Sequence, residues 1–167
     1  DKSAQYLRKM GGLILVASLF VWFLSYFPRP VAGEPEIEHY ENSYLGQLGR
    51  WCEPAVEPLG LNWKAGVAIL SGVSAKEIVV STLGVLYSQD ATADDASLAQ
   101  TLRESGDFTP ASALAFLVFV LLYFPCIATI VAVRNEAGRG WALASMVYST
   151  AVAWFVAWIV YHIALLL

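Results

Sequence analysis

The sequence predicts an all-α fold, namely a polytopic membrane helical bundle that contains one broken or re-entrant segment. Hydrophobic residues make up 57% of the 167 residues and charged residues 14%, whereas soluble domains have about 25% charged residues. Long apolar runs alternate with polar loops, as they do in proteins that cross a bilayer several times. One run also carries an adjacent lysine and glutamate and several glycines, a composition typical of an interrupted membrane helix.

Residues 1–27 are predicted to form the first transmembrane helix. A spanning helix needs about 20 mainly apolar residues. The run is apolar up to Phe27 and is followed by Pro28, which lacks the N–H that a continuing helix requires. Basic residues precede the apolar part, so the positive-inside rule places the start of the helix in the cytoplasm. These basic residues are Lys2, Arg8 and Lys9.

Residues 28–64 are predicted to form an acidic periplasmic loop that contains one short helix. The helix is expected over residues 43–56, capped by Asn42 or Ser43, because apolar positions at helical spacing follow a residue type that caps well. Its expected apolar side consists of Leu45, Leu48, Trp51, Cys52 and Val56. Residues 88–110 are predicted to form a second acidic loop, with a short helix over residues 96–104.

Residues 65–87 form the second apolar segment, whose topology has two interpretations. If the segment crosses the bilayer, the basic turn with Arg134 and Arg139 falls outside the cell. If the segment dips in and returns, this turn falls inside, which the positive-inside rule prefers. Glycines and a charged pair also suit a re-entrant element. Residues 111–167 are expected to form a transmembrane helical hairpin whose first arm is interrupted at Pro125.

Lys76 and Glu77 are the charged pair of this segment, and each costs about 2.5–3.5 kcal/mol inside a membrane. Consecutive residues of a helix point about 100° apart, so the two charges are not expected to neutralise each other. We expect a structural role for Lys76. Glu77 shares a helix face with small residues, as a path for cations requires, and these are Ser74, Ser81 and Gly84. The alternative is that both charges pair with other helices and stabilise the bundle.

The sequence YFPCIATI, residues 123–130, is the second candidate site. Pro125 removes the hydrogen bond to the carbonyl of Leu121, and Cys126 and Thr129 follow on one helix face. A thiol, a hydroxyl and a freed carbonyl suit the transient binding of a borderline-soft divalent metal. The alternative is that Cys126 is a small buried hydrophobic residue, which is the usual role of a free cysteine.

Several functions are excluded by what the sequence does not contain. The chain has no phosphate-binding loop, no G-x-G-x-x-G pattern and no H-E-x-x-H pattern. The net charge is -4 and no basic run stands out, so nucleic acid is not an expected partner. We therefore expect that the chain neither binds a nucleotide nor acts as an enzyme.

Two stretches carry a family resemblance. GVAILSGVSAKEIVVSTLGVLY and FLVFVLLYFPCIATIVAVRNEAG resemble the second Gate region of the FeoB family of bacterial ferrous-iron transporters. The flanking segments are similar as well, so the resemblance covers essentially the whole chain. Cys52 departs from it, since an apolar residue is expected there. The resemblance implies a Gate-type half, Fe(II) as the transported ion, and Glu77 and Cys126 as positions on the metal path.

The resemblance also implies the surroundings of the chain. Family members are multi-pass proteins of the bacterial inner membrane, in which a GTP-binding domain and a first Gate half precede the region that this chain resembles. We therefore expect a C-terminal fragment without a permanently bound cofactor, with GTP and Mg²⁺ bound only by an absent upstream domain. The expected partners are the lipid bilayer, the N-terminal half of the parent protein, further copies of the protein, and a small cytoplasmic accessory protein.

Two other functions remain as alternatives. A Gate-type carrier for an organic solute such as a nucleoside needs aromatic and amide side chains along its cavity, and the second and third apolar segments contain few amides. A membrane scaffold without transport would use Lys76 and Glu77 only for structure. In that case, neutralising both charges together should cost less than neutralising one.

Overall fold

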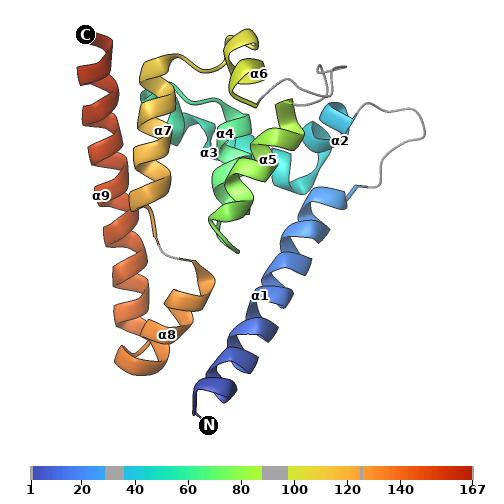
Figure 1. Cartoon of the computed structure of the whole chain (residues 1–167), viewed down its shortest axis with the longest axis vertical. Helices are drawn as coiled ribbons and strands as arrows, with labels where there is room; N and C mark the ends of the chain where they lie inside the picture. The colour runs from blue at the N-terminus through green and yellow to red at the C-terminus, as the bar shows by residue number, and fades with distance from the viewer. Residues whose placement is uncertain (1, 29–35, 88–97, 125, 167) are drawn as a thin grey trace.

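The computed structural model describes residues 2–28, 36–87, 98–124 and 126–166, and every regular element in these residues is a helix (Figure 1). The predicted all-α class is therefore confirmed for the described part of the chain. The elements are α1 (Lys2–Tyr26), α2 (Glu36–Asn42), α3 (Tyr44–Val56), the 3₁₀ helix η1 (Glu57–Leu59), α4 (Trp63–Ser71), α5 (Glu77–Tyr87), α6 (Leu98–Glu104), α7 (Pro110–Leu122), α8 (Ile127–Ala137) and α9 (Arg139–Leu166).

Of the described helices, α9 alone is long and apolar enough to cross a membrane by length and composition. Only 11% of its most apolar window is buried, so its apolar side chains face mostly outward. Shorter apolar helical stretches occur at the end of α1, in α5 and in α7. α5 and α7 are short because two predicted elements, the apolar segment over residues 65–87 and the first arm of the hairpin over residues 111–167, are each divided into two helices.

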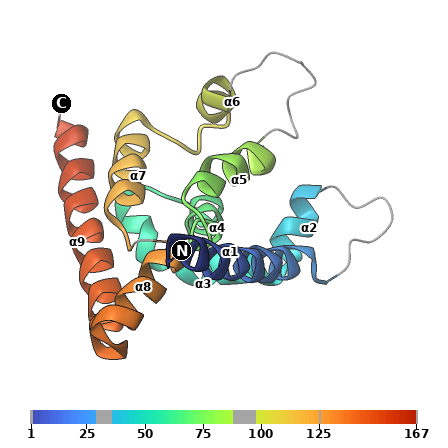
Figure 2. The ribbon, with the colours of Figure 1, turned by 60° about the horizontal axis from the view of Figure 1, so that its bottom comes forward.

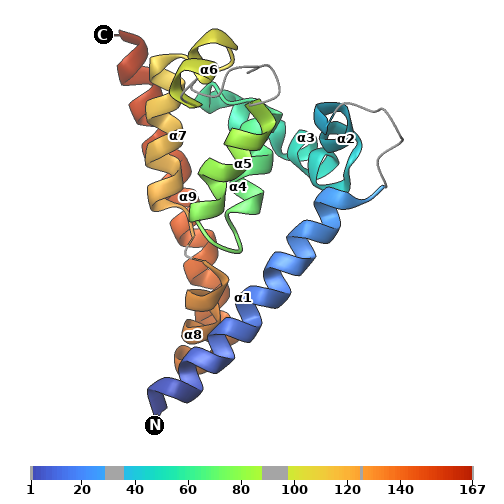
Figure 3. The same cartoon turned by 45° about the vertical axis from the view of Figure 1, so that its right-hand side comes forward.

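Residues 65–87 fold back on themselves, as a hairpin of α4 and α5. The side-chain amide of Asn62, the N-cap of α4, donates to the hydroxyl of Tyr87 at the end of α5 (3.3 Å). Asp107 strengthens this closure, because its carboxylate accepts from the Tyr87 hydroxyl (2.9 Å) and from Lys64 (3.3 Å). The chain thus enters and leaves the hairpin at the same end, which is the shape of a re-entrant segment (Figure 3).

α7 and α8 form the interrupted arm of a second hairpin, whose other arm is α9 (Figure 1). The turn between α8 and α9 lies at Gly138, whose φ of +93° is favourable only for glycine. Ala153 and Ala157, one turn apart on α9, are fully buried, and such small side chains allow two helices to approach closely. Figure 2 shows α9 along one side of the molecule, next to α7 and α8.

The two regions that carry basic residues near helix ends lie together at one end of the molecule. The start of α1 and the turn between α8 and α9 are both at the bottom of Figure 1, and α1 contacts α8 (Figure 3). α2 and α3 lie near the opposite end of α1. A segment 65–87 that crossed the bilayer would separate these two basic regions, so the arrangement agrees with the re-entrant interpretation.

The buried face of α3 differs from the predicted one. Leu45 and Val56 are buried, as expected, but Leu48 is 40% and Trp51 79% exposed. The prediction was wrong for these two because α3 turns a glycine, Gly49, toward α4, where the two backbones come into contact. Contact through a glycine favours close packing of the backbones over burial of the largest side chains.

The predicted cap of α3 is confirmed, and it offers a first test of the fold. The Ser43 hydroxyl is buried and accepts from the Gly46 N–H (3.0 Å). We expect Ser43→Ala to lower the free energy of unfolding by about 1 kcal/mol, since an unpaired N–H then remains at the helix start. Chemical unfolding of the full chain in detergent measures this. Ser25→Ala is the control, because the Ser25 hydroxyl only donates to the Trp22 carbonyl of its own helix, and an equal loss in both variants would contradict the prediction.

Candidate cation path at two helix breaks

Two interruptions of helical segments meet in this structure. The first comprises residues 72–76 between α4 and α5, and the second lies between the end of α7 and the start of α8. The N–H of Ile127, the first residue of α8, donates to the carbonyl of Val73 (3.3 Å). This bond joins the two interruptions directly, and we refer to the place where they meet as the crossing.

Lys76 also joins the two breaks, and the expectation of a structural role for it agrees with its contacts. Its ammonium donates to the carbonyls of Val120 (3.1 Å), Leu121 (3.1 Å) and Tyr123 (3.4 Å). The last carbonyls of any helix have no donor within the helix, and the proline at position 125 supplies none. The freed carbonyl of Leu121 therefore has a partner, and that partner comes from the other break.

Glu77 is the first residue of α5, and its side chain is exposed. A carboxylate is favourable at this position, because the N-terminus of a helix carries a partial positive charge. Among the described residues no ion pair involves Glu77 or Lys76; the pairs found are Arg50–Glu41 and Lys64–Asp107. The prediction that the two neighbouring charges do not neutralise each other is thus in agreement with the structure.

The polar stripe predicted around Glu77 is only partly present. Ser81 is exposed one turn along α5, as expected, and its hydroxyl donates to the carbonyl of Ile78 (3.0 Å). The prediction for Ser74 was wrong, because the helix ends at Ser71 and begins again at Glu77. Ser74 lies instead in the connecting turn, buried, with its hydroxyl donating to the carbonyl of Ser71 (3.0 Å).

Cys126 and Thr129 lie together at the start of α8, as their spacing predicts. Cys126 is the N-cap of the helix, and its sulfur is 3.7 Å from the Thr129 hydroxyl oxygen. The thiol is half-buried and the hydroxyl is exposed. The other cysteine, Cys52, is half-buried in α3, where burial raises the pKa of its thiol.

Tyr123 and Gly72 are parts of the crossing that sequence reasoning missed. Tyr123 is 2% exposed, and its hydroxyl has no hydrogen-bond partner among the described residues. A Cβ atom built on Gly72 would lie 2.5 Å from this hydroxyl oxygen, so the ring packs where Gly72 has no side chain. The ring also lies under the Lys76 ammonium, 4.8 Å from it to the ring centroid. No local pattern reveals this contact, because its residues are 51 positions apart.

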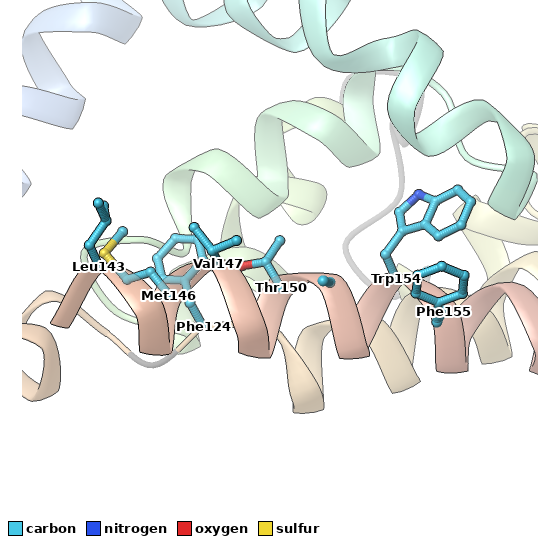
Figure 4. A pocket seen from close by; sticks show the side chains of 8 residues that line it. Phe124, Leu143, Met146, Val147, Thr150, Trp154 and Phe155 are labelled. Carbon is cyan, nitrogen blue, oxygen red and sulfur yellow. The ribbon is translucent and has the colours of Figure 1, made fainter. Parts of the chain in front are cut away.

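Two hollows lie beside these elements. Figure 4 shows the first, an apolar groove of about 630 Å³ along α9 that reaches Phe124 and in which Thr150 supplies the one side-chain hydroxyl. The second, of about 420 Å³, is lined by Glu53, Glu57 and Asp107 near the closed end of the α4–α5 hairpin. In the described residues no three His, Cys, Asp or Glu side chains are placed to hold a metal ion together.

Comparison with known proteins identifies the family. The family model described as "Gate: Nucleoside recognition" matches residues 7–140, which include both helix breaks. The chain belongs to the Gate family. The relatives of this Gate chain include an Fe(2+) transport protein A/Fe(2+) transporter FeoB fusion protein of Porphyromonas gingivalis, which is 41% identical over 99% of the chain and 24% of its own length.

Other relatives of the Gate chain are named Fe(2+) transporter FeoB. The protein of Campylobacter jejuni is 37% identical over 100% of the chain and 28% of its own length. That of Methanocaldococcus jannaschii is 36% identical over 96% of the chain and 24% of its own length. The chain thus spans about a quarter of the length of the curated relatives it matches. No solved structure matches the chain.

Proposed function

We propose that this chain is part of the membrane permease of a GTP-regulated ferrous-iron transporter, that it forms half of the metal path, and that Fe²⁺ passes through the crossing. The names of its relatives support Fe²⁺ as the cargo, and the meeting of the two helix breaks is the observation that carries the proposal. Broken helices bring free backbone groups and charged side chains into a membrane bundle, as transporters of ions require. The chain itself acts as a permease and performs no enzymatic step.

Glu77 and Cys126 are the proposed contacts of the cargo, one from the start of α5 and one from the start of α8. A carboxylate compensates the charge of a partly dehydrated Fe²⁺, and a thiol group is a soft ligand for it. Thr129 and Ser81 add exposed hydroxyl oxygens, whereas the Ser74 hydroxyl is buried and donates to the Ser71 carbonyl. A site with few protein ligands holds the ion weakly enough to release it, which conduction requires.

We propose a topology in which the basic end of the molecule is cytoplasmic. Residues 1–27 cross outward, residues 28–64 and 88–110 form loops outside, residues 65–87 enter and return from outside, and residues 111–167 cross inward and outward again. The closed end of the α4–α5 hairpin, with Asn62 and Tyr87, supports this arrangement. It makes the chain a multi-pass protein of the inner membrane, the location proposed from its relatives.

The chain is proposed to work within a longer polypeptide. The length of its relatives supports this, since the chain spans about a quarter of them. The upstream part would contribute a first Gate half and a domain that binds GTP with Mg²⁺. Lipid and further copies of the same protein complete the proposed environment. A small accessory protein is supported by the Porphyromonas gingivalis relative, whose name joins transport protein A to the transporter.

Uptake of ⁵⁵Fe²⁺ tests the proposed metal path. The cells lack their own ferrous-iron uptake and express the full-length protein that carries this chain. We expect Glu77→Gln and Cys126→Ser each to lower the uptake rate about tenfold or more at equal protein level, because each removes a ligand and leaves the fold in place. Uptake at the unsubstituted rate in both variants would refute the assignment of these residues.

Matched controls separate a lost ligand from a damaged protein. Cys52→Ser replaces the other thiol of the chain, and Glu104→Gln neutralises an exposed glutamate in α6, away from both breaks. We expect full uptake from both controls. A nucleoside that accumulates in place of iron, or that competes with it, would instead support the organic-solute alternative.

A further inference from the structure

The end of α7 has the form of an occupied cation site. Three carbonyl oxygens, of Val120, Leu121 and Tyr123, lie 3.1, 3.1 and 3.4 Å from the Lys76 ammonium nitrogen. The face of the Tyr123 ring lies 4.8 Å from the same nitrogen and attracts a cation through its quadrupole. Each of these four contacts of the ammonium is thus an oxygen dipole or an aromatic face. We call this group of three carbonyls and one ring the carbonyl cage.

The carbonyl cage is built without the lysine side chain. Its oxygens belong to the backbone at the end of α7, where helix geometry leaves carbonyls without donors. Tyr123 is held in place independently, because its ring stacks on Phe119 with centroids 5.6 Å apart and is buried. A substitution at position 76 therefore removes the occupant and leaves the cage.

The charge of Lys76 is compensated differently from that of Lys64. Lys64 pairs with the carboxylate of Asp107 at 3.3 Å and also lies 4.4 Å from the centroid of the Tyr87 ring. Lys76 forms no ion pair among the described residues, so its positive charge is stabilised by backbone dipoles and a ring. Neutral carbonyls arranged in this way replace the hydration shell of a monovalent cation in channel filters.

We propose that the carbonyl cage at the end of α7 is a binding site for a monovalent cation and that Lys76 fills it with a tethered ammonium, which fastens the α4–α5 hairpin to the α7–α8 break. The cage consists of other residues than the contacts proposed for iron, and its assignment does not depend on those contacts. It explains why a full positive charge is placed in an apolar segment beside a glutamate with which it does not pair.

Thermal unfolding of the full chain in detergent tests the site without reference to transport. Lys76→Ala is compared with the unsubstituted chain in rubidium, ammonium and choline chloride at equal ionic strength, by circular dichroism. We expect the midpoint for Lys76→Ala to be about 2–4 °C higher in rubidium or ammonium than in choline, because the small cations enter the empty cage and choline is too large. The unsubstituted chain should show no difference, since its cage is filled.

Two further variants complete the test, one as a replacement for Lys76→Ala and one as a control. Lys76→Met retains an apolar stem. It replaces Lys76→Ala in the test if Lys76→Ala does not fold in any of the three salts. Arg50→Ala removes a cation that is paired with the carboxylate of Glu41, and we expect it to show no preference among the salts. Equal midpoints in all salts for the folded Lys76 variants would overturn the proposal. So would a failure of both variants to fold in any salt, because free cations then cannot replace the ammonium.

Discussion

Gly72→Val should destabilise the fold by about 3 kcal/mol and abolish transport. A Cβ atom at this position would overlap the side chain of Val79 and lie 2.5 Å from the hydroxyl oxygen of Tyr123 and 3.3 Å from the Ile69 carbonyl oxygen. Overpacking of this kind typically costs 1–3 kcal/mol, and here the tip of the hairpin must also move. That movement breaks the hydrogen bond from Ile127 to Val73 and withdraws Lys76 from the end of α7.

The matched control is Gly84→Val, on the same hairpin. A Cβ atom built on Gly84 meets nothing within 4 Å, and valine is a better helix residue than glycine by a few tenths of a kcal/mol. We expect this variant to unfold at the same temperature as the unsubstituted chain, or slightly higher. Thermal unfolding in detergent compares the two valine variants, and ⁵⁵Fe²⁺ uptake is measured for Gly72→Val alone, because Gly84 lies on the helix face assigned to the cation path. Equal stability of the two valine variants would show that the space at Gly72 is not needed.

Removing the Tyr123 hydroxyl tests whether this group causes the clash with a side chain at position 72. The hydroxyl is buried and has no hydrogen-bond partner among the described residues, so Tyr123→Phe alone should be neutral or slightly stabilising. Combined with Gly72→Ala, it should recover part of the stability that Gly72→Ala loses. A double-mutant cycle measures this coupling, and strictly additive effects would place the clash elsewhere, for example at Val79.

The sequence was most informative at residues whose chemistry is unfavourable in an apolar helical segment. Lys76 and Glu77 are conspicuous because charges are costly in an apolar segment, and Pro125 predicts a freed carbonyl at Leu121. Spacing also predicted that Cys126 and Thr129 lie together, since residues three apart share a helix face. These features follow from local geometry, and the structure agrees with each of them.

The contacts across the crossing were not predictable in the same way. The nearest partner of Lys76 along the chain lies 44 residues away at Val120, and only the packing of two hairpins brings the two together. Helical spacing failed for Ser74 because it assumes an unbroken helix, and the helix ends at Ser71. Helical spacing placed Trp51 on the apolar side of α3, whereas glycine determined which face packs. Tertiary packing overrides propensity in each of these cases.

The face of α3 that carries Gly49 gives the second prediction with a large expected effect on stability, for the substitution Gly49→Leu. A Cβ atom on Gly49 would lie 3.0 Å from the Trp63 carbonyl oxygen and 3.3 Å from the Val67 backbone nitrogen, and one on Gly66 would lie 3.2 Å from the Gly49 carbonyl oxygen. The nearest obstacle is the Val67 side chain, whose Cγ2 atom would lie 2.5 Å from the Cβ atom on Gly49. Beyond it lies the backbone of α4, which cannot rotate away as a side chain does. We expect a loss of about 3 kcal/mol or more and separation of α3 from α4.

Graded substitutions make the expectation for this contact quantitative. Gly49→Ala should lose less stability than Gly49→Leu, because only one atom must be accommodated, and both should lose more than Gly12→Leu. Gly12 lies in α1, and a Cβ atom built on it meets nothing within 4 Å. Hydrogen exchange of the α3 amides, measured beside thermal unfolding, should rise in the two Gly49 variants and stay unchanged in the control. Unchanged exchange in Gly49→Leu would mean that α3 and α4 tolerate a side chain between them, and that another contact holds α3 against the hairpin.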